Sequence, residues 1–363
     1  MNANAQNYSP WLHRFVVVTA AATFLLLGSG GMVTSHEAGM SVPDWPNTYG
    51  YNMFLFPVSK WVGGIFYEHT HRLLASGIGL LTTILTVWLW RKDARAWMRW
   101  LGVLAFVLVT LQGVLGGLRV TLDMDKLGIV HGALAQLFFV LICALALFTS
   151  RWWQNVAQAS RLPGQQISRC VAGTAALHWL VLFTTLLIFL QLVLGATMRH
   201  QHAGLAIPDF PAAYGKVWPD TSADAVARYN EQRMNVIAEN PITAFQIILQ
   251  MAHRIVALAI LIGVAVCAQQ AWRRLGKKHP LTRLAVFWLA LIAVQIALGA
   301  ATIWSNKAAD VATAHVLVGA LSLVTGALWC AAAFHRLEPS SRVEPAGTIS
   351  GAFGTHPAMV GNK

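Results

Sequence analysis

A glutamate, two histidines and an arginine occur together in residues 68–72 (EHTHR), at the start of a long apolar segment. No formal charge follows between residues 73 and 90. Charged groups at the end of a membrane helix are costly unless they face a bundle interior, a partner or a cofactor. Glu68 and His71 would share one face of a helix because they stand three residues apart. An acid and a metal ligand could therefore address one bound group.

Comparable histidines occur in three other apolar segments, each near the beginning of its segment. The four candidate metal ligands are His71, His131, His253 and His315. Two facing histidines at similar depth in a helical bundle suit the axial ligation of a haem iron. The alternative is that such histidines only hydrogen-bond between helices. The repeated pairing favours haem, and zinc is disfavoured because no further Cys or His completes four ligands within either half.

The two histidine segments differ at one position. Glu68 stands three residues before His71, whereas Gln250 stands three residues before His253. A carboxylate can accept a proton or stabilise a developing positive charge, but an amide cannot take the proton. We therefore predict that the first half is reactive and that the second half carries electrons. The alternative for Glu68 is a simple ion pair with an arginine.

An arginine directly follows one histidine in each half: Arg72 follows His71, and Arg254 follows His253. Such arginines could bind haem propionates through charge-assisted hydrogen bonds. Alternatively, they could extend toward lipid headgroups. Their duplication beside duplicated histidines favours the propionates.

The composition is that of a membrane protein. Hydrophobic residues make up 56% of the 363 residues, charged residues 11%, and the mean hydropathy is +0.55. These values exclude an ordinary soluble domain. The net charge of +12 does not indicate a nucleic-acid partner, because the basic residues lie in short loops between apolar segments.

Eight apolar windows are long enough to cross the hydrocarbon core of a bilayer. They lie near residues 15–34, 64–90, 101–118, 127–149, 171–198, 243–268, 284–304 and 311–334. The sequence therefore predicts an all-α membrane protein with eight transmembrane helices.

Basic residues predict the orientation of these helices. Loops 91–100, 150–170 and 271–283 hold four, three and five Lys or Arg residues, whereas the short loops on the other side hold few. Both termini are therefore predicted to be cytoplasmic. The long loops 35–62 and 199–242 would face outward, where their polar residues favour solvated lids. Each contains a Pro-Asp-aromatic-Pro sequence that favours a turn.

The chain also repeats itself. Gly30 to Pro46 aligns with Gly195 to Pro211, and the histidines recur in the same order afterwards. Because both halves would begin on the cytoplasmic side, we predict two parallel-repeat four-helix bundles related by an axis along the membrane normal. The predicted parts are a cytoplasmic N-terminus (1–14), an N-terminal half (15–150), a cytoplasmic linker (151–170), a C-terminal half (171–335) and a disordered cytoplasmic tail (336–363).

Taken in order, these residues resemble the heme A synthase family, membrane enzymes that oxidise a methyl group of heme o to the formyl group of heme a. The resemblance covers about residues 15 to 335. It rests on residues 68–72, His131-Gly132, His253-Arg254, His315, the segment from Gly30 to Trp45 and the eight-helix plan. One His-Arg pair is a weak signal, whereas the ordered set is specific.

The resemblance implies an oxidoreductase that acts on the C8 methyl group through hydroxylated intermediates, with water as the oxygen source and heme a as the product for terminal oxidases. It implies that His71 and His131 receive the substrate heme o and that His253 and His315 ligate a resident heme b. Glu68 matches the family's Glu-x-x-His glutamate, implicated in the oxidation. The cysteine pair that some members carry in the first outer loop is absent from this sequence.

The implied partners are heme o, heme a and the lipid bilayer of the cell inner membrane. A heme o synthase, cytochrome c oxidase assembly factors and a second copy of the chain are candidate protein partners. The main alternative function is a non-enzymatic diheme cytochrome b that carries electrons. A transporter built on parallel repeats is a third, but the apolar segments lack the interior prolines that would support it.

Overall fold

The computed structural model describes residues 8–153, 171–233 and 241–335. Its long helices are α1 (Pro10–Ser35), α2 (Gly63–Lys92), α3 (Ala96–Thr121), α4 (Leu127–Thr149), α6 (Val171–His200), α8 (Ala244–Leu275), α9 (Pro280–Trp304) and α10 (Ala309–His335). All eight are long and apolar enough to cross a membrane. The predicted all-α membrane protein with eight spans is confirmed, and each predicted window falls on one of these helices.

Local sequence signals set several helix starts. The Ser9 hydroxyl accepts a hydrogen bond from the Leu12 amide, and Pro10 occupies the first turn of α1. Proline is favoured there because its missing N–H is not needed. At the start of α8, Thr243 and Gln246 form a reciprocal capping box. Elsewhere along these helices, apolar side chains meet neighbouring helices or face outward.

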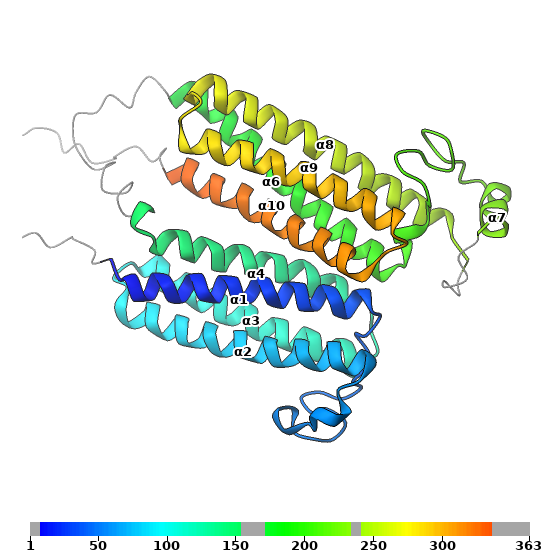
Figure 1. The fold of residues 1–363 in the computed structure, drawn as a ribbon. Helices are drawn as coiled ribbons and strands as arrows, with labels where there is room; N and C mark the ends of the chain where they lie inside the picture. Colours follow the sequence, from blue (N-terminus) through cyan, green and yellow to red (C-terminus); the bar gives the residue numbers. More distant parts are fainter. Residues whose placement is uncertain (1–7, 154–170, 234–240, 336–363) are drawn as a thin grey trace, which may run out of the picture.

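The helices pack in two groups of four (Figure 1). In the first group, α1 and α3 both contact α2 and α4; in the second group, α6 and α9 both contact α8 and α10. The groups meet where α1 and α4 contact α10, and where α4 contacts α6. The descent of the groups from a parallel repeat stays a prediction, as do the part boundaries. Most of the predicted linker, half of the predicted N-terminus and the whole tail lie outside the described residues.

Each group has its own apolar core. Leu85, Leu89 and Ile142 are fully buried in the first group, and Trp288 and Trp329 are fully buried in the second. Many large apolar side chains on the outer faces of the helices remain exposed. This pattern suits helices whose outer faces contact lipid, because lipid tails are as apolar as the core.

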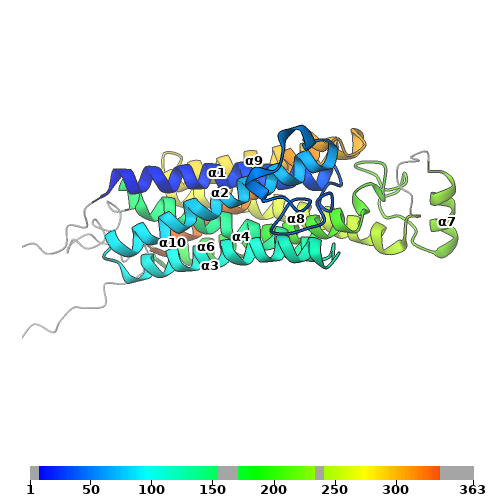
Figure 2. The same ribbon diagram turned by 90° about the horizontal axis from the view of Figure 1, so that it is seen from below.

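Two long segments connect helices at the same end of the molecule. The first long loop, residues 36–62, contains the short helices η1 (Met53–Leu55) and η2 (Val58–Lys60). The second long loop, residues 201–243, contains η3 (Ala203–Leu205) and α7 (Ala223–Glu231). The first lies alongside α2, whereas the second extends past the helix ends to α7 (Figures 1 and 2). Which side of the membrane this end faces stays a prediction.

Candidate functional site

The four predicted histidines lie at one end of the molecule, the end that carries both long loops; we call it the histidine end. Each occupies the second or third turn of its helix: His71 in α2, His131 in α4, His253 in α8 and His315 in α10. All four side chains are half-buried. The helical packing therefore places one pair in each group at similar depth.

The histidine pair of the second group has the spacing of two ligands to one metal. The ring centroids of His253 and His315 are 6.5 Å apart, and the rings are tilted by 55°. Two imidazoles that share an ion through bonds of about 2 Å would place their centroids about 6 Å apart. The spacing of the two rings is therefore close to that of a shared metal ion.

Glycines on neighbouring helices stand beside the histidine rings. A Cβ atom added to Gly195 or Gly299 would lie 3.4 or 3.2 Å from the Cε1 atom of His253 or His315, respectively. In the first group, the corresponding contacts are Gly30 to His71 at 3.1 Å and Gly116 to His131 at 3.5 Å. Sequence reasoning did not single out these four glycines for this role. The signal was available, since Gly30 matches Gly195 and Gly116 matches Gly299 in the repeat.

Several ring nitrogens lack protein partners. The Nδ1 atoms of His71, His253 and His315 are buried, and no group in the described part of the chain hydrogen-bonds to them. Buried polar atoms normally have a partner. Within the same described residues, no cluster of three or more His, Cys, Asp or Glu side chains could hold a metal ion by itself. Two histidines per group suit an iron that brings its own equatorial ligands, as a porphyrin does.

Glutamines on α3 and α9 contact the histidine that follows them in the same group. With its side-chain oxygen and nitrogen oriented so that both form hydrogen bonds, Gln112 donates to the Nδ1 atom of His131 at 2.9 Å and accepts from the Ala135 amide at 3.2 Å. The Nε2 atom of Gln295 lies 3.4 Å from the Nε2 atom of His315. These glutamines can orient the rings, and the repeat alignment includes both of them.

Glu68 is buried and connects α2 to the first long loop. Its Oε2 atom accepts a hydrogen bond from the Val42 amide at 2.8 Å, and its Oε1 atom pairs with Arg72 at 2.7 Å. The ion pair considered as the alternative is therefore present. The catalytic role stays a prediction, because an ion pair does not exclude further chemistry at the same carboxylate.

Both arginines that follow histidines bind backbone carbonyl groups of the long loops. Arg72 donates to Asp44 at 2.6 Å and to Val42 at 2.8 Å. Arg254 donates to Asp209 at 2.7 Å and to Ala212 at 2.8 Å. These bonds hold each loop against the helix that carries the histidine. Contact of the arginines with propionates stays a prediction.

Gln250 connects the second long loop to α8 in the way that Glu68 connects the first loop to α2. Its Oε1 atom accepts from the Ile207 amide at 2.7 Å, and its Nε2 atom donates to the Gly204 and Ile207 carbonyls at 3.3 Å. The amide thus satisfies three backbone groups without any charge.

The Pro-Asp-aromatic-Pro sequences lie in bends, and each aspartate accepts hydrogen bonds from a turn that follows at residues 49–50 or 214–215. The Asp44 carboxylate accepts from the amides of Tyr49 at 2.7 Å and Gly50 at 2.8 Å. Asp209 makes the same two bonds in the second long loop. Burial raises the pKa of Asp44, but the amide hydrogen bonds and the positive charge of Arg72 outweigh that effect and lower the pKa overall.

His69, the other histidine of the EHTHR segment, is fully buried away from the paired histidines. Its Nδ1 atom lies 3.2 Å from the Thr48 hydroxyl, and its ring packs against Phe56 and Trp61. The side chain therefore anchors the first long loop.

Polar contacts also join the two helical groups at the histidine end. Arg199 of α6 donates to the Gly31 carbonyl and the Ser35 hydroxyl of α1, both at 2.8 Å. His200 and Arg119 both contact Asp125, at 2.9 and 2.6 Å. Burial raises the pKa of Asp125, but these two partners outweigh it and lower the pKa. Sequence reasoning missed the contacts of Arg199 and His200 because they join segments far apart in the chain.

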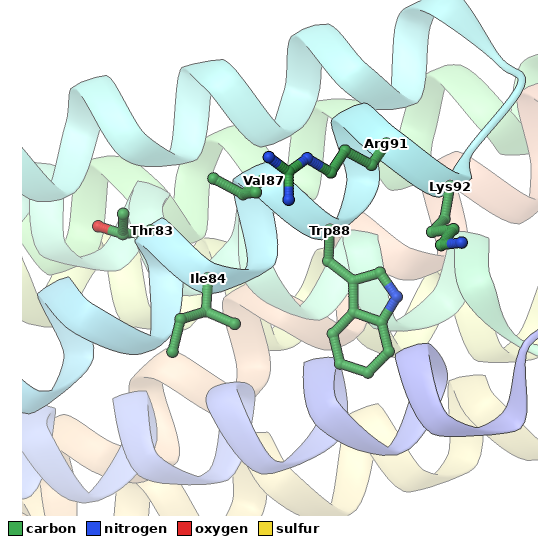
Figure 3. A pocket seen from close by; sticks show the side chains of 6 residues that line it. All are labelled: Thr83, Ile84, Val87, Trp88, Arg91 and Lys92. Atoms are coloured by element: carbon green, nitrogen blue, oxygen red, sulfur yellow. The ribbon is translucent and has the colours of Figure 1, made fainter.

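A groove of about 400 Å³ lies on the outer face of α2 and contains none of the predicted site residues (Figure 3). It is lined by Thr83, Ile84, Val87, Trp88, Arg91 and Lys92. These residues belong to the end of α2 remote from His71. Apolar side chains topped by two basic groups suit a boundary lipid better than the chemistry considered above.

Fold and site together define a multi-pass membrane protein with a histidine pair suited to a porphyrin iron. The sequence pattern of the cytochrome oxidase assembly protein family matches residues 13–327. The chain belongs to this family.

Relatives in this family carry the name heme A synthase. The chain is 28% identical to the heme A synthase of Rhizorhabdus wittichii over 350 residues, covering 88% of this chain and 92% of the relative. It is 25% identical to that of Geobacillus kaustophilus over 306 residues, covering 82% and 83%. The resemblance found in the sequence is thereby confirmed.

Proposed function

We propose that this protein is a heme A synthase that oxidises the C8 methyl group of heme o to a formyl group through hydroxylated intermediates, with oxygen from water. The main support is that the rings of His253 and His315 are spaced like two ligands of one metal ion, in a chain whose relatives are named heme A synthase. On this proposal the protein is an oxidoreductase that supplies heme a for terminal oxidases.

The two histidine pairs would have different tasks. His253 and His315 would hold a resident heme b, and His71 and His131 would receive the substrate heme o. A bound heme b supplies one-electron redox chemistry. The glycines let the neighbouring helices pack directly against the rings and fix the ring positions, because a methyl group there would approach the imidazoles to 3.1–3.5 Å.

Glu68 is the proposed proton acceptor. Hydroxylation of a methyl group by water forms a C–O bond, breaks a C–H bond and releases two protons and two electrons. The electrons would pass to an external oxidant of the one-electron or two-electron class, and a base close to the substrate can take a proton. The carboxylate already accepts from Val42 and Arg72, but its oxygens retain further acceptor capacity. Arg72 holds the carboxylate in place through the 2.7 Å contact with its Oε1 atom. Gln250 could not serve this function, which supports assigning substrate to the first group.

The proposed orientation places the histidine end outside the cytoplasm of the cell inner membrane. The basic loops between α2 and α3 and between α8 and α9 lie at the opposite end, which supports cytoplasmic placement there and cytoplasmic termini. Heme o synthase, cytochrome c oxidase assembly factors and a second copy of the chain remain proposed partners. A diheme electron carrier is not favoured, because all four histidines lie at one end and provide no path across the membrane.

Purification followed by pigment extraction and mass analysis tests this proposal. We expect heme b together with heme o, heme a or a hydroxylated intermediate. His253→Ala and His315→Ala should each lose heme b while the protein keeps its helical fold. A colourless wild-type protein would overturn the proposal.

Glu68→Gln tests the role of the carboxylate. The natural Gln250 shows that an amide can be accommodated at the matching position of the second group. We expect the variant to keep its fold and its heme b but to convert heme o at least about 100-fold more slowly, the usual scale for loss of a general base. Undiminished heme a formation would remove Glu68 from the mechanism.

A further inference from the structure

The first long loop displays a row of large apolar side chains without protein cover. Phe54, Leu55, Val58 and Val62 are 68%, 76%, 74% and 63% exposed. We call these four residues the apolar face of the first long loop. Single exposed apolar residues are common, but a contiguous set marks an interaction surface. The sequence had favoured a solvated lid here, and this face does not suit one.

The loop is firmly held, so the exposure of its apolar face does not come from a loose segment. Phe56, only 5% exposed, points the other way and packs against Tyr49, Tyr51 and His69. The Lys60 ammonium group donates to the Tyr51 hydroxyl at 3.0 Å. The loop thus has a small core on one side and the apolar face on the other.

The apolar face is continuous with the side of α2 that contacts lipid. Val62 directly precedes α2, and the exposed side chains of Phe66, Leu74 and Leu80 continue along that helix. Both ribbon views place the loop alongside the histidine end of the first group, within the length of its helices (Figures 1 and 2). The membrane that surrounds α2 would therefore also reach this loop.

The second long loop differs in position and charge. It extends beyond the helix ends in both views. Residues 201–233 carry Asp209, Lys216, Asp220, Asp224, Arg228, Glu231 and Arg233. The first loop, residues 36–62, carries only Glu37, Asp44 and Lys60. Charged segments resist insertion into a bilayer, so the second loop suits water.

We propose that the apolar face of the first long loop inserts into the lipid leaflet at the histidine end, beside α2. Phe54, Leu55 and Val58 would lie among acyl chains, while Lys60 and Tyr51 would mark the level of the headgroups. The loop held by Glu68 and Arg72 would then form the boundary between the first histidine pair and the lipid. This inference depends on the loop surface and not on the proposed reaction.

Photocrosslinking of the full-length protein in phosphatidylethanolamine and phosphatidylglycerol vesicles tests the inference. A genetically encoded benzoylphenylalanine is placed at Leu55 or Val58. Leu80 on α2 serves as the lipid-facing reference, and Val217 in the second long loop, which is 94% exposed, as the aqueous control. We expect lipid adducts at Leu55 and Val58 at the Leu80 level and about tenfold above Val217. Yields at the Val217 level, or crosslinks to a second protein chain in place of lipid, would overturn the proposal.

Hydroxyl-radical footprinting provides a second measurement, and it uses the wild-type protein without any substitution. Phe54 and Trp218 are both well exposed, at 68% and 52%. With each residue normalised to the unfolded chain, we expect Phe54 to be protected about tenfold more than Trp218 in vesicles. Equal labelling of the two would contradict insertion.

Discussion

The two long loops are attached to their helices by the same bond, but the acceptor differs. Glu68 accepts from the Val42 amide at 2.8 Å, and Gln250 accepts from the Ile207 amide at 2.7 Å. An uncharged amide is therefore sufficient to hold a loop. The charge at Glu68 must serve another purpose, and the ion pair with Arg72 and the proposed proton transfer are the two candidates.

The neighbouring arginines show the consequence of this difference. Arg72 bonds to loop carbonyls and also to Glu68 at 2.7 Å. Arg254 bonds to loop carbonyls and lies over the Phe210 ring, 5.4 Å from its centroid. One group thus balances a buried charge with a second charge, and the other uses an aromatic face. Removing Glu68 takes the carboxylate partner from Arg72, whereas removing Gln250 takes no charged partner from Arg254.

Alanine substitutions at the two positions should give the largest contrast. Glu68→Ala leaves Arg72 without its carboxylate and Val42 without its acceptor, and we expect a loss of about 3–5 kcal/mol in unfolding free energy. Gln250→Ala removes only neutral hydrogen bonds and should cost about 1–3 kcal/mol. Thermal and denaturant unfolding in one detergent measures both. Glu68→Gln is the control, and its loss of unfolding free energy should be smaller than that of Glu68→Ala. Equal losses for the two alanine variants would contradict the comparison.

The sequence was sufficient to predict the helices and the common level of the histidines, because both follow from hydropathy and from position along an apolar segment. His71 and His253 lie where the EHTHR segment and its repeat placed them. The glycines beside the rings were not predicted, since helix rotation decides which residue of a neighbouring helix faces a ring. Arg72 illustrates another limit, because bonds from a side chain to loop carbonyls leave no periodic pattern in a sequence.

A difference in packing between the loops provides a second test. In the first group, Trp45 lies so close to Gly117 that a Cβ atom there would be 2.7 Å from the indole Cε2 atom. The repeat places Phe210 and Ala300 at the matching positions. A large ring beside glycine in one group thus corresponds to a smaller ring and an alanine in the other.

Gly117→Ala should displace the Trp45 ring and destabilise the protein by about 1–3 kcal/mol, the usual cost of overpacking. Adding Trp45→Phe reproduces the pair of the second group and should recover part of this loss, giving a favourable coupling energy in a double-mutant cycle. Unfolding free energies of the four proteins measure it. Trp45→Phe alone is the control, and strictly additive losses would show that the two residues do not share this contact.

The smallest expected effect concerns acid and the turn at Asp44. Its pKa is lowered from the ordinary value of 3.8: burial raises it, but hydrogen bonds from Gly50 and Tyr49 and the charge of Arg72 outweigh burial. A carboxylate with a lowered folded pKa stabilises the fold fully above about pH 4, and this contribution is lost as pH falls through the folded value. Protection of the Tyr49 and Gly50 amides against hydrogen exchange, corrected for intrinsic rates, should therefore fall below pH 4.

Asp44→Asn separates this titration from other effects of acid on the protein. An asparagine oxygen can still accept one amide hydrogen bond but does not titrate in this range. We expect the variant to show lower protection of Tyr49 and Gly50 at neutral pH and a flatter response to acid than the wild type. Protection that falls equally steeply in both proteins would place the acid-sensitive group elsewhere.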